Sequence, residues 1–475
     1  MKNEFKTGIF FTAIAQYSTV IVQLLINMIL SRLLTPKEIG MVTIVQVIIF
    51  FFQLLAGSAL GPAIVQNKQL DNNDYGILFN FSIMLGVFLA LIFGIGGGFG
   101  LSAIYNNGIY ISLCWSMAPI IIMGAMGQVP NGILSKEKRF KEISLRLLLS
   151  GVLGAAFGIV AAFLHAGVYS MVLVFIVTDL FSLLLNLRMT KIKYTKSLSF
   201  VSVRKILPFF KNQTSFSIIN YLYRNLDNLM IGKFLGAVPL GNYSKSYQLL
   251  SLPVTVFLSV INPVMQPILA EYETNVDLIR ETYLKVCRIL AFIAIPISIF
   301  FCLNSEEIIY LLFGRQWTLA IVPLSFLSLS IWAQMLAQSM PAIWQVRNLT
   351  NIQAVNGVLS LIVIGASIIL GITFGSITNV AIAVSLAYIL NFIISASLLM
   401  NRALESNLFY LLKELIKPAL LGIFLALVLV ITNPYLEFSN LFLTLLIRGI
   451  FWIFLIAAFL AAIGELKTIK EMVKG

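Results

Sequence analysis

The chain has 475 residues, of which 59% are hydrophobic and 11% are charged, and its mean hydropathy is +0.97. Soluble domains carry roughly 25% charged residues, so this composition predicts a membrane protein with many spans and excludes a soluble globular domain. The net charge of +13 is explained by basic residues that gather on the cytoplasmic side of membrane proteins, and we infer no nucleic-acid partner.

Fourteen apolar stretches are long enough to cross a bilayer, which takes about 20 residues in a helix. They lie at 8–34, 38–66, 75–100, 109–134, 144–165, 167–187, 206–236, 240–269, 284–303, 317–346, 352–374, 376–400, 415–433 and 441–463. The basic start is like that of a signal peptide, but the apolar run continues to Leu34 without a cleavage site. We therefore interpret 8–34 as a retained first span and predict an all-α polytopic membrane protein.

The distribution of basic residues predicts the orientation of these spans. Most of the 32 Lys and Arg fall at the chain ends and around the loops that follow even-numbered spans. The opposite face receives only Arg32, Lys37, Lys233 and Arg315, while Arg224, Lys245 and Arg448 fall within spans. This bias places both termini in the cytoplasm of a bacterial cell, with the protein in the cytoplasmic membrane.

An internal repeat divides the chain. With a shift of 201 residues, SRLLTPKEIG at 31–40 overlays GKFLGAVPLG at 232–241, so that Arg32 meets Lys233 and Gly40 meets Gly241. Both copies begin on the same side of the membrane, which predicts two parallel six-helix bundles. The predicted parts are a bundle at 1–190, a basic cytoplasmic linker at 191–205, a second bundle at 206–402, and two further spans with a tail at 403–475.

Polar side chains line one face of several spans and predict a wet cavity. In the seventh span they step by three and four residues, as on one side of a helix. This stripe comprises Gln213, Ser217, Asn220, Arg224 and Asp227, and the stripe of the next span includes Lys245, Gln248, Thr255 and Ser259. The first span repeats the pattern with Gln23 and Asn27, which overlays Asn228.

Charges inside spans are expensive and are therefore candidates for function. Arg224 is the best candidate ligand for an anion, because a guanidinium binds phosphate through two hydrogen bonds. Lys245 and Lys233 could add positive charge, and Asp227 and Asp179 are candidate carriers of a coupling proton or sodium ion. Further predicted substrate ligands are Arg32, Gln23, Asn27, Asn228, Gln248, Gln334 and Gln338. The alternatives are a structural ion pair between Arg224 and Asp227 and a helix-packing hydrogen bond at Asp179.

The sequence contains no signature of an enzyme or of a bound cofactor. The only histidine, His165, ends a span, and no Cys, His, Asp and Glu cluster has the spacing of a metal site. The run GIGGGFG at 94–100 is not a nucleotide-binding motif, and we interpret it as a helix-packing surface. Gln334 and Gln338 follow one face of the tenth span beside Trp332 and Trp344, which suits either a sugar or the membrane interface.

The motif at 31–40 resembles one found in the polysaccharide (Wzx-type) flippases after their first span. Its matching residues are Arg32, Leu34, Thr35, Pro36, Ile39 and Gly40, and DNLMIGKFLGAVPLGNYSKSYQL at 227–249 resembles the second-half motif. The family shares a superfamily with multidrug and toxin extruders and lipid II flippases. The resemblance extends along the whole chain, including the fourteen-span layout.

The resemblance implies a protein that moves oligosaccharides linked to undecaprenyl diphosphate to the outer leaflet by alternating access. It also implies basic cavity residues that hold the diphosphate, and a pathway shared with glycosyltransferases and a glycan polymerase. Two alternatives stay open. One is a multidrug or cation exporter, which would favour an acidic and aromatic cavity. The other is a subunit of a glycan assembly complex that does not itself transport.

Overall fold

The computed structural model describes residues 2–57, 60–67, 70–192, 204, 214, 217–218, 221, 225–270 and 272–465. In this part of the chain the elements are all helices, as predicted. Ten of these helices are long and apolar enough to span a membrane, or eleven if one bent pair counts as a span. The protein is thus a multi-pass membrane protein, and the number of fourteen spans stays a prediction because most of 206–224 lies outside the described residues.

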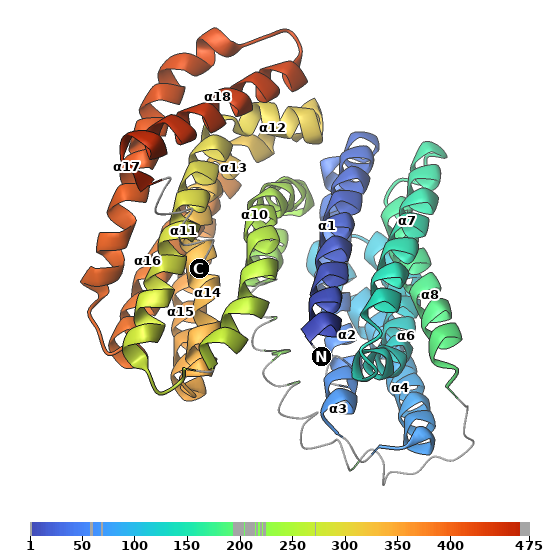
Figure 1. Ribbon diagram of the computed structural model, residues 1–475. Coiled ribbons are helices and arrows are strands. Elements are labelled where there is room, and N and C mark those ends of the chain that lie inside the picture. The colour runs from blue at the N-terminus through green and yellow to red at the C-terminus, as the bar shows by residue number, and fades with distance from the viewer. Residues whose placement is uncertain are drawn as a thin grey trace. The chain divides into compact units, whose positions relative to one another are not determined.

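The chain packs as two units, Met1–Gly241 and Asn242–Gly475 (Figure 1). The first unit contains α1 (Lys2–Leu33), α2 (Pro36–Gly57), α3 (Leu60–Gln66), α4 (Asn72–Ile92), the π-helical turn η1 (Phe93–Gly97), α5 (Gly98–Tyr105), α6 (Ile109–Lys136), α7 (Phe140–Phe163) and α8 (Tyr169–Thr190). At its centre α6 packs against α2, α3, α4 and α8, and α7 packs against α1 and α8. In the Gly-rich run, the ring of Trp115 lies against Gly94, as expected of a packing surface.

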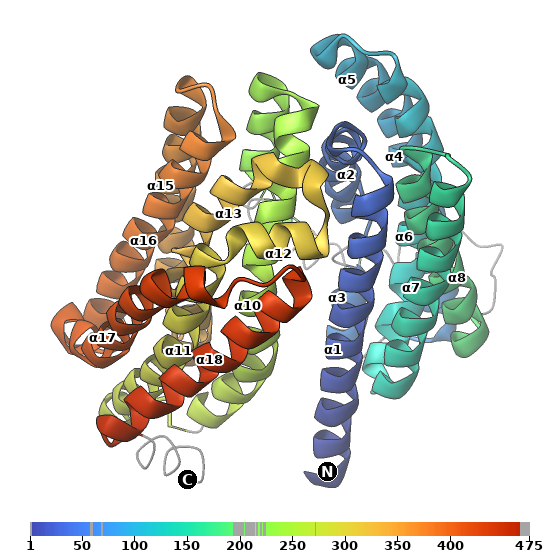
Figure 2. The same cartoon turned by 90° about the horizontal axis from the view of Figure 1, so that it is seen from above.

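The second unit begins within α10 (Ala237–Ala270), whose first turn belongs to the first unit. It continues with α11 (Val276–Leu303), α12 (Ser305–Leu312), the 3-10 helix η2 (Arg315–Ala320), α13 (Ile321–Ser328), α14 (Ile331–Val346), α15 (Thr350–Thr373), α16 (Ile377–Arg402), α17 (Leu408–Thr432), η3 (Asn433–Leu436) and α18 (Leu441–Ala462). Figure 2 shows α17 and α18 along one flank of this unit, where α17 packs on α11 and α18 contacts α12.

Most of the predicted linker at 191–205 lies outside the described residues, and the linker stays a prediction. Farther along the chain, described residues of the predicted second bundle pack on α2: the Tyr221 hydroxyl donates to the carbonyl of Val47, and Gly232 lies against Ile44. By its packing, the first unit therefore includes residues that the repeat assigns to the second bundle.

Polar residues between the apolar runs determine where many helices begin. Thr35 and Glu38 form a capping box at the start of α2, and Pro36 occupies the first helical position, where its missing N–H is not needed. Side chains of Asn275, Ser376, Asn407 and Asn440 accept hydrogen bonds from the first turns of α11, α16, α17 and α18.

Loops that the sequence places on the same face meet in the structure. In the first unit, the Lys136 ammonium donates to the carbonyl of Asn67 at 2.8 Å, and Arg139 donates to the carbonyl of Met189 at 3.0 Å. In the second unit, Arg347 donates to the carbonyl of Glu273, in the preceding loop of this face, and to the carbonyl of Ala403, in the following one. Arg280 donates to the carbonyl of Leu404. These contacts agree with the predicted alternation of spans within each unit.

The predicted tenth span at 317–346 is a bent pair of helices instead of one straight helix. The segments Arg315–Ser328 and Ile331–Val346 meet at 57°. At the bend, the hydroxyls of Ser328 and Ser330 donate back to the carbonyls of Leu324 and Leu327. Serine side chains that bond back to the preceding turn compete with the helix and bend it.

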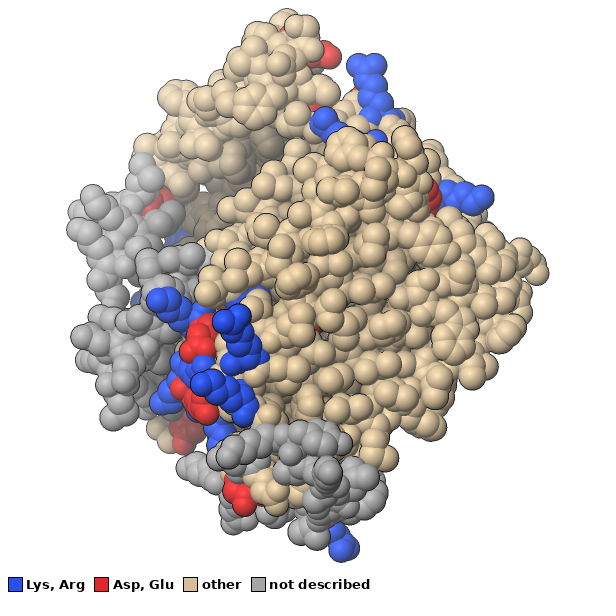
Figure 3. All heavy atoms as spheres, turned by 90° about the vertical axis from the view of Figure 1, so that its right-hand side faces the viewer, with Lys and Arg blue, Asp and Glu red and all other residues tan. Residues whose placement is uncertain are grey.

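The outer face of the first unit matches a lipid environment. Figure 3 shows a broad area of uncharged residues on this side, with Lys, Arg, Asp and Glu gathered at its edges. Large apolar side chains are exposed along the lengths of α7 and α8, among them Leu149, Phe157, Val160 and Leu184. In a soluble protein such a surface would be an interaction patch, but on a spanning helix it contacts acyl chains.

Candidate functional site

Lys245 is the best-defined of the predicted ligands. It lies on α10 with only 3% of its surface exposed. Its ammonium is 4.9 Å from the centre of the Phe313 ring and 5.7 Å from that of Trp317, and both rings are fully buried. The neighbouring Ser246 donates to the carbonyl of Ala320 at 2.7 Å and fixes α10 against η2. Cation–π attraction therefore helps to hold a charged side chain inside an apolar unit.

Asp227 is buried, at 5% exposure, in the first unit. Its carboxylate accepts a hydrogen bond at 2.8 Å from the backbone N–H of Asn228, whose own side-chain oxygen is buried without a hydrogen-bond partner among the described residues. Arg224 lies outside the described residues. The predicted pairing of Arg224 with Asp227, and the role of Arg224 as the anion ligand, therefore stay predictions.

Three other predicted ligands of the first unit are exposed at the ends or surfaces of helices. These are Gln23, Arg32 and Lys233. The Lys233 ammonium lies 5.3 Å from the ring centre of its neighbour Phe234, and Asn27 donates from its side chain to the carbonyl of Gln23 at 2.8 Å. Arg32 and Lys233 thus occupy matching and similarly exposed positions in the two repeats.

The predicted glutamines of the second unit are partly inside it. Gln334 on α14 is buried and donates to the hydroxyl of Ser330, the residue that precedes this helix, at 3.0 Å. Gln248 on α10 and Gln338 on α14 are half-buried. Of the two tryptophans beside this stripe, Trp344 is buried in the core, and Trp332 packs edge-on against Phe392. Trp344 is therefore a packing residue and not a plate exposed to a sugar.

Asp179 on α8 makes a helix-packing hydrogen bond, which is the alternative to ion coupling that the sequence analysis left open. Its carboxylate accepts from the side-chain amide of Gln53 on α2 at 3.2 Å, and the same amide lies 3.4 Å from the carbonyl of Ile120 on α6. These two bonds connect three helices of the first unit. The proposed role of Asp179 as a carrier is not excluded by this contact, and it stays a prediction.

Arg146 is a buried charge that the sequence reasoning did not single out. It lies on α7 with 6% exposure and donates to the side-chain oxygen of Asn186 on α8 at 2.6 Å. The Asn186 amide in turn lies 3.4 Å from the carbonyl of Gly127 on α6. The Nε of Arg146 has no hydrogen-bond partner in the part of the chain that the structure describes. An arginine within the predicted span 144–165 was the available signal.

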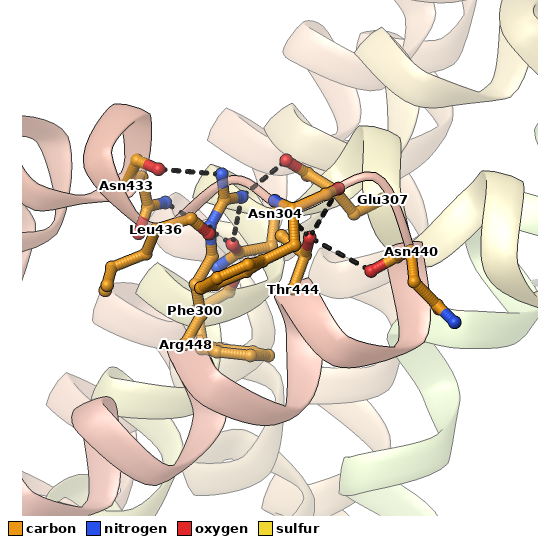
Figure 4. A network of polar contacts seen from close by, with 9 residues as sticks. Phe300, Asn304, Glu307, Asn433, Leu436, Asn440, Thr444 and Arg448 are labelled. Carbon is orange, nitrogen blue, oxygen red and sulfur yellow. Dashed lines mark hydrogen bonds and ion pairs between the residues drawn. The ribbon is translucent and has the colours of Figure 1, made fainter.

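Arg448 on α18 lies in a second buried network, in the other unit (Figure 4). Its guanidinium forms an ion pair with Glu307 and donates to the side-chain oxygen of Asn304 at 3.0 Å. It also donates to the carbonyls of Asn433, at 2.9 Å, and Leu436, at 3.2 Å. With these four acceptors the guanidinium joins α18 to α12 and to η3, so we assign Arg448 a structural role.

The comparisons with known proteins agree with this architecture. The model of the polysaccharide biosynthesis protein family matches residues 29–322. The chain belongs to this family. It is 23% identical to the teichuronic acid biosynthesis protein TuaB of Bacillus subtilis (strain 168) over 418 residues, which cover 87% of this chain and 86% of TuaB. It is 24% identical to the lipopolysaccharide biosynthesis protein WzxC of Escherichia coli (strain K12) over 298 residues, 62% and 60% of the two chains.

Among solved structures, the chain is similar to the lipid II flippase MurJ in an inward closed conformation. The TM-score is 0.78 with 14% sequence identity, and the superposition covers 97% of this chain and all of MurJ. At this identity the likeness establishes the fold of a multi-span transporter. The family is named for polysaccharide biosynthesis and the similar structure is that of a flippase, so neither comparison points to an enzyme.

Proposed function

We propose that the protein moves lipid-linked oligosaccharide repeat units from the inner to the outer leaflet of the bacterial cytoplasmic membrane. The carrier lipid would be undecaprenyl diphosphate, the mechanism alternating access, and the product a cell-surface polysaccharide. Partners would be the glycosyltransferases that complete the repeat unit and the polymerase that consumes it. The family, the relatives named for polysaccharide synthesis, and the flippase-like fold support this proposal.

The structural observation in its favour is the buried ammonium of Lys245. A lysine inside an apolar unit is expensive, and such residues generally have a function. The faces of Phe313 and Trp317 attract the cation inside the second unit. A positive charge at this position would attract a diphosphate and repel a cationic drug. Lys245 therefore favours an anionic cargo over the cations expected of a multidrug exporter.

Coupling to an ion gradient is a further part of the proposal. Asp227 and Asp179 are the two acidic residues that the sequence places within spans as candidate carriers, and both lie in the first unit. Both carboxylates accept a hydrogen bond, Asp179 from the Gln53 amide and Asp227 from the backbone N–H of Asn228.

The proposal is tested in the native host after deletion of the gene. Wild-type protein should restore surface polysaccharide and remove the accumulated lipid-linked oligosaccharide. Lys245→Ala should lower export at least about tenfold, because hydrogen bonds to charged groups are worth roughly 1.5–3 kcal/mol, and Lys245→Arg should recover part of the loss. The matched control is Lys37→Ala, at an exposed lysine of the same charge. Normal export by Lys245→Ala, at equal protein levels in the membrane, would remove the lysine from the site.

A further inference from the structure

The two aromatic rings that hold Lys245 lie on the short connection between α12 and α13. Phe313 caps the C-terminal end of α12, and its backbone N–H donates to the carbonyl of Ile309 at 2.8 Å. Gly314 follows with φ +97°, a conformation that favours glycine. The backbone N–H of Trp317 in η2 then donates to the carbonyl of Gly314 at 3.2 Å. The positions of both rings are therefore determined by where α12 ends.

These rings lie within a narrow range of distances from the cation. The Lys245 ammonium is 4.9 Å from the centre of the Phe313 ring and 5.7 Å from that of the Trp317 ring. The two rings meet edge to face, with their centres 6.3 Å apart. Cation–π attraction requires the cation to lie within about 6 Å of the ring centre. The Trp317 contact is close to this limit, so a small displacement of α12 would remove it.

The other end of α12 is held by Arg448 of α18 (Figure 4). The guanidinium forms an ion pair with Glu307 in the first turn of α12 and donates at 3.0 Å to the side chain of Asn304, the residue before this helix. It also donates to the carbonyls of Asn433 and Leu436 in η3. Because α12 has only eight residues, its position depends on contacts of this kind with its surroundings.

We propose that Arg448, beyond its structural role, is a positioning residue for the anion site at Lys245: it holds α12 so that Phe313 and Trp317 stay against the ammonium. Glu307 and Phe313 are at opposite ends of one short helix, about 9 Å apart along its axis, so a change at the ion pair moves the rings. All of these residues lie in the second unit. The proposal rests on the proposed function, in which Lys245 binds the diphosphate of the substrate.

The proposal gives α17 and α18 a part in substrate binding. Both helices lie outside the predicted six-helix repeats, whereas Lys245 is on α10, within the second repeat. Through Arg448 and η3, the connection between α17 and α18 sets the position of the rings beside this lysine. The rings hold the ammonium in one place and offset part of the cost of its burial. Their displacement should therefore weaken anion binding without unfolding the unit.

The first test observes the rings directly and needs no substrate. The protein is produced with fluorotryptophan at its five tryptophans, and the fluorine NMR signal of Trp317 is assigned by its loss in Trp317→Phe. Lys245→Met should shift this signal, because it removes the cation beside the ring. Glu307→Ala should shift the same signal, because it releases α12 from Arg448.

The matched control for this test is Arg288→Ala. Arg288 also forms an ion pair with a buried glutamate of the second unit, Glu465. It lies in the first half of α11, however, whereas α12 follows the far end of α11. The Trp317 signal should stay unchanged in this variant. If Glu307→Ala does not fold, Glu307→Gln and Arg448→Lys take its place, and an unchanged Trp317 signal in the variants that fold would overturn the proposal.

The second test is a double-mutant cycle in diphosphate binding. The affinity for farnesyl diphosphate, a short polyprenyl diphosphate, is measured in detergent for the wild type, Glu307→Ala, Lys245→Ala and the double variant. Glu307→Ala alone should weaken binding roughly threefold to fivefold, which corresponds to the loss of one aromatic contact. In the Lys245→Ala background it should have no further effect, because a positioning residue acts only through the lysine that it positions.

Equal losses of affinity in both backgrounds would mean that Glu307→Ala acts through a general loss of structure, and they would overturn the proposal. The proposed function is judged separately, because normal export by Lys245→Ala removes the lysine from the site whatever the Trp317 signal shows. If Lys245→Ala lowers binding and export while the effect of Glu307→Ala is additive, the site at Lys245 stands and the positioning role of Arg448 is wrong.

Discussion

Arg146 and Arg448 are both buried arginines on membrane helices, one in each unit, yet their surroundings differ. Arg448 has a carboxylate, an amide oxygen and two backbone carbonyls as acceptors. Arg146 has the amide oxygen of Asn186, and no carboxylate lies within ion-pair distance of it among the described residues. Burial alone therefore does not show what a charge does. A guanidinium with four acceptors, one of them a carboxylate, joins helices, whereas one held by a neutral amide has no opposite charge among its acceptors in the described part of the chain.

The largest effect is expected from Arg448→Ala. The substitution leaves the partly buried Glu307 without its cation and leaves the Asn304, Asn433 and Leu436 acceptors without their donor. Breaking a buried ion pair costs about 3–5 kcal/mol, and the partial exposure of Glu307 places the expected loss at the lower end, about 3 kcal/mol. Thermal unfolding of the purified protein in detergent should show the strongest destabilisation of the series. Arg402→Ala, at an exposed arginine on α16, is the control and should unfold like the wild type. Equal thermal stability of the two variants would show that the hydrogen bonds and ion pair of Arg448 do not stabilise the fold.

An intermediate effect is expected from Glu307→Gln, which gives Arg448 the neutral kind of partner that Arg146 has. The amide oxygen can still accept from the guanidinium, but the charge assistance is lost, and the cost should be roughly 1–2 kcal/mol. The same thermal measurement should place this variant between wild type and Arg448→Ala. A loss as large as that of Arg448→Ala would show that charge, and not the number of acceptors, decides the strength of the network.

The smallest effect is expected from Arg146→Met. The change removes a buried charge without leaving an opposite charge behind, and it leaves the buried side-chain oxygen of Asn186 without its donor. The stability should therefore fall by about 1 kcal/mol, the low end of the cost of a buried unpaired acceptor, because the desolvated charge is removed with it. Export should be measured in the same variant, because an unchanged stability with lost export would assign Arg146 a role in transport. A destabilisation as large as that of the Arg448→Ala variant would show that Arg146 also has a structural role.

The sequence predicted the helical fold well because the hydrophobic signal is strong. Runs of about 20 apolar residues leave few alternatives in a bilayer, where backbone polar groups must be satisfied within a helix. Hydropathy did not predict the bend near Ser330, because one serine that bonds back to the preceding turn hardly changes the mean hydropathy of the span. It also did not predict that residues after the linker pack on α2, since packing partners of apolar helices are chosen by shape.

The candidate site was predicted less completely. Lys245 was singled out because a charge in an apolar run is conspicuous, but its aromatic partners Phe313 and Trp317 are about seventy residues away in the chain. Arg146 was missed although it lies within the predicted span 144–165, and its partner Asn186 could be recognised only once α7 and α8 bring the two together. Gln334 was predicted as a substrate ligand; its amide donates to the Ser330 hydroxyl at the start of its own helix, and a role in binding stays a prediction.

By itself, the sequence determined the membrane location, the helical class, the repeat and the family resemblance, since each follows from local hydrophobicity or from patterns along the chain. The tertiary structure alone decided which buried charges have partners and which glycines touch. Ion pairs and backbone contacts depend on distances of a few ångströms between distant segments. The equivalence of Gly40 and Gly241 was visible in the sequence, but only folding showed that each lies against the other motif's carbonyl.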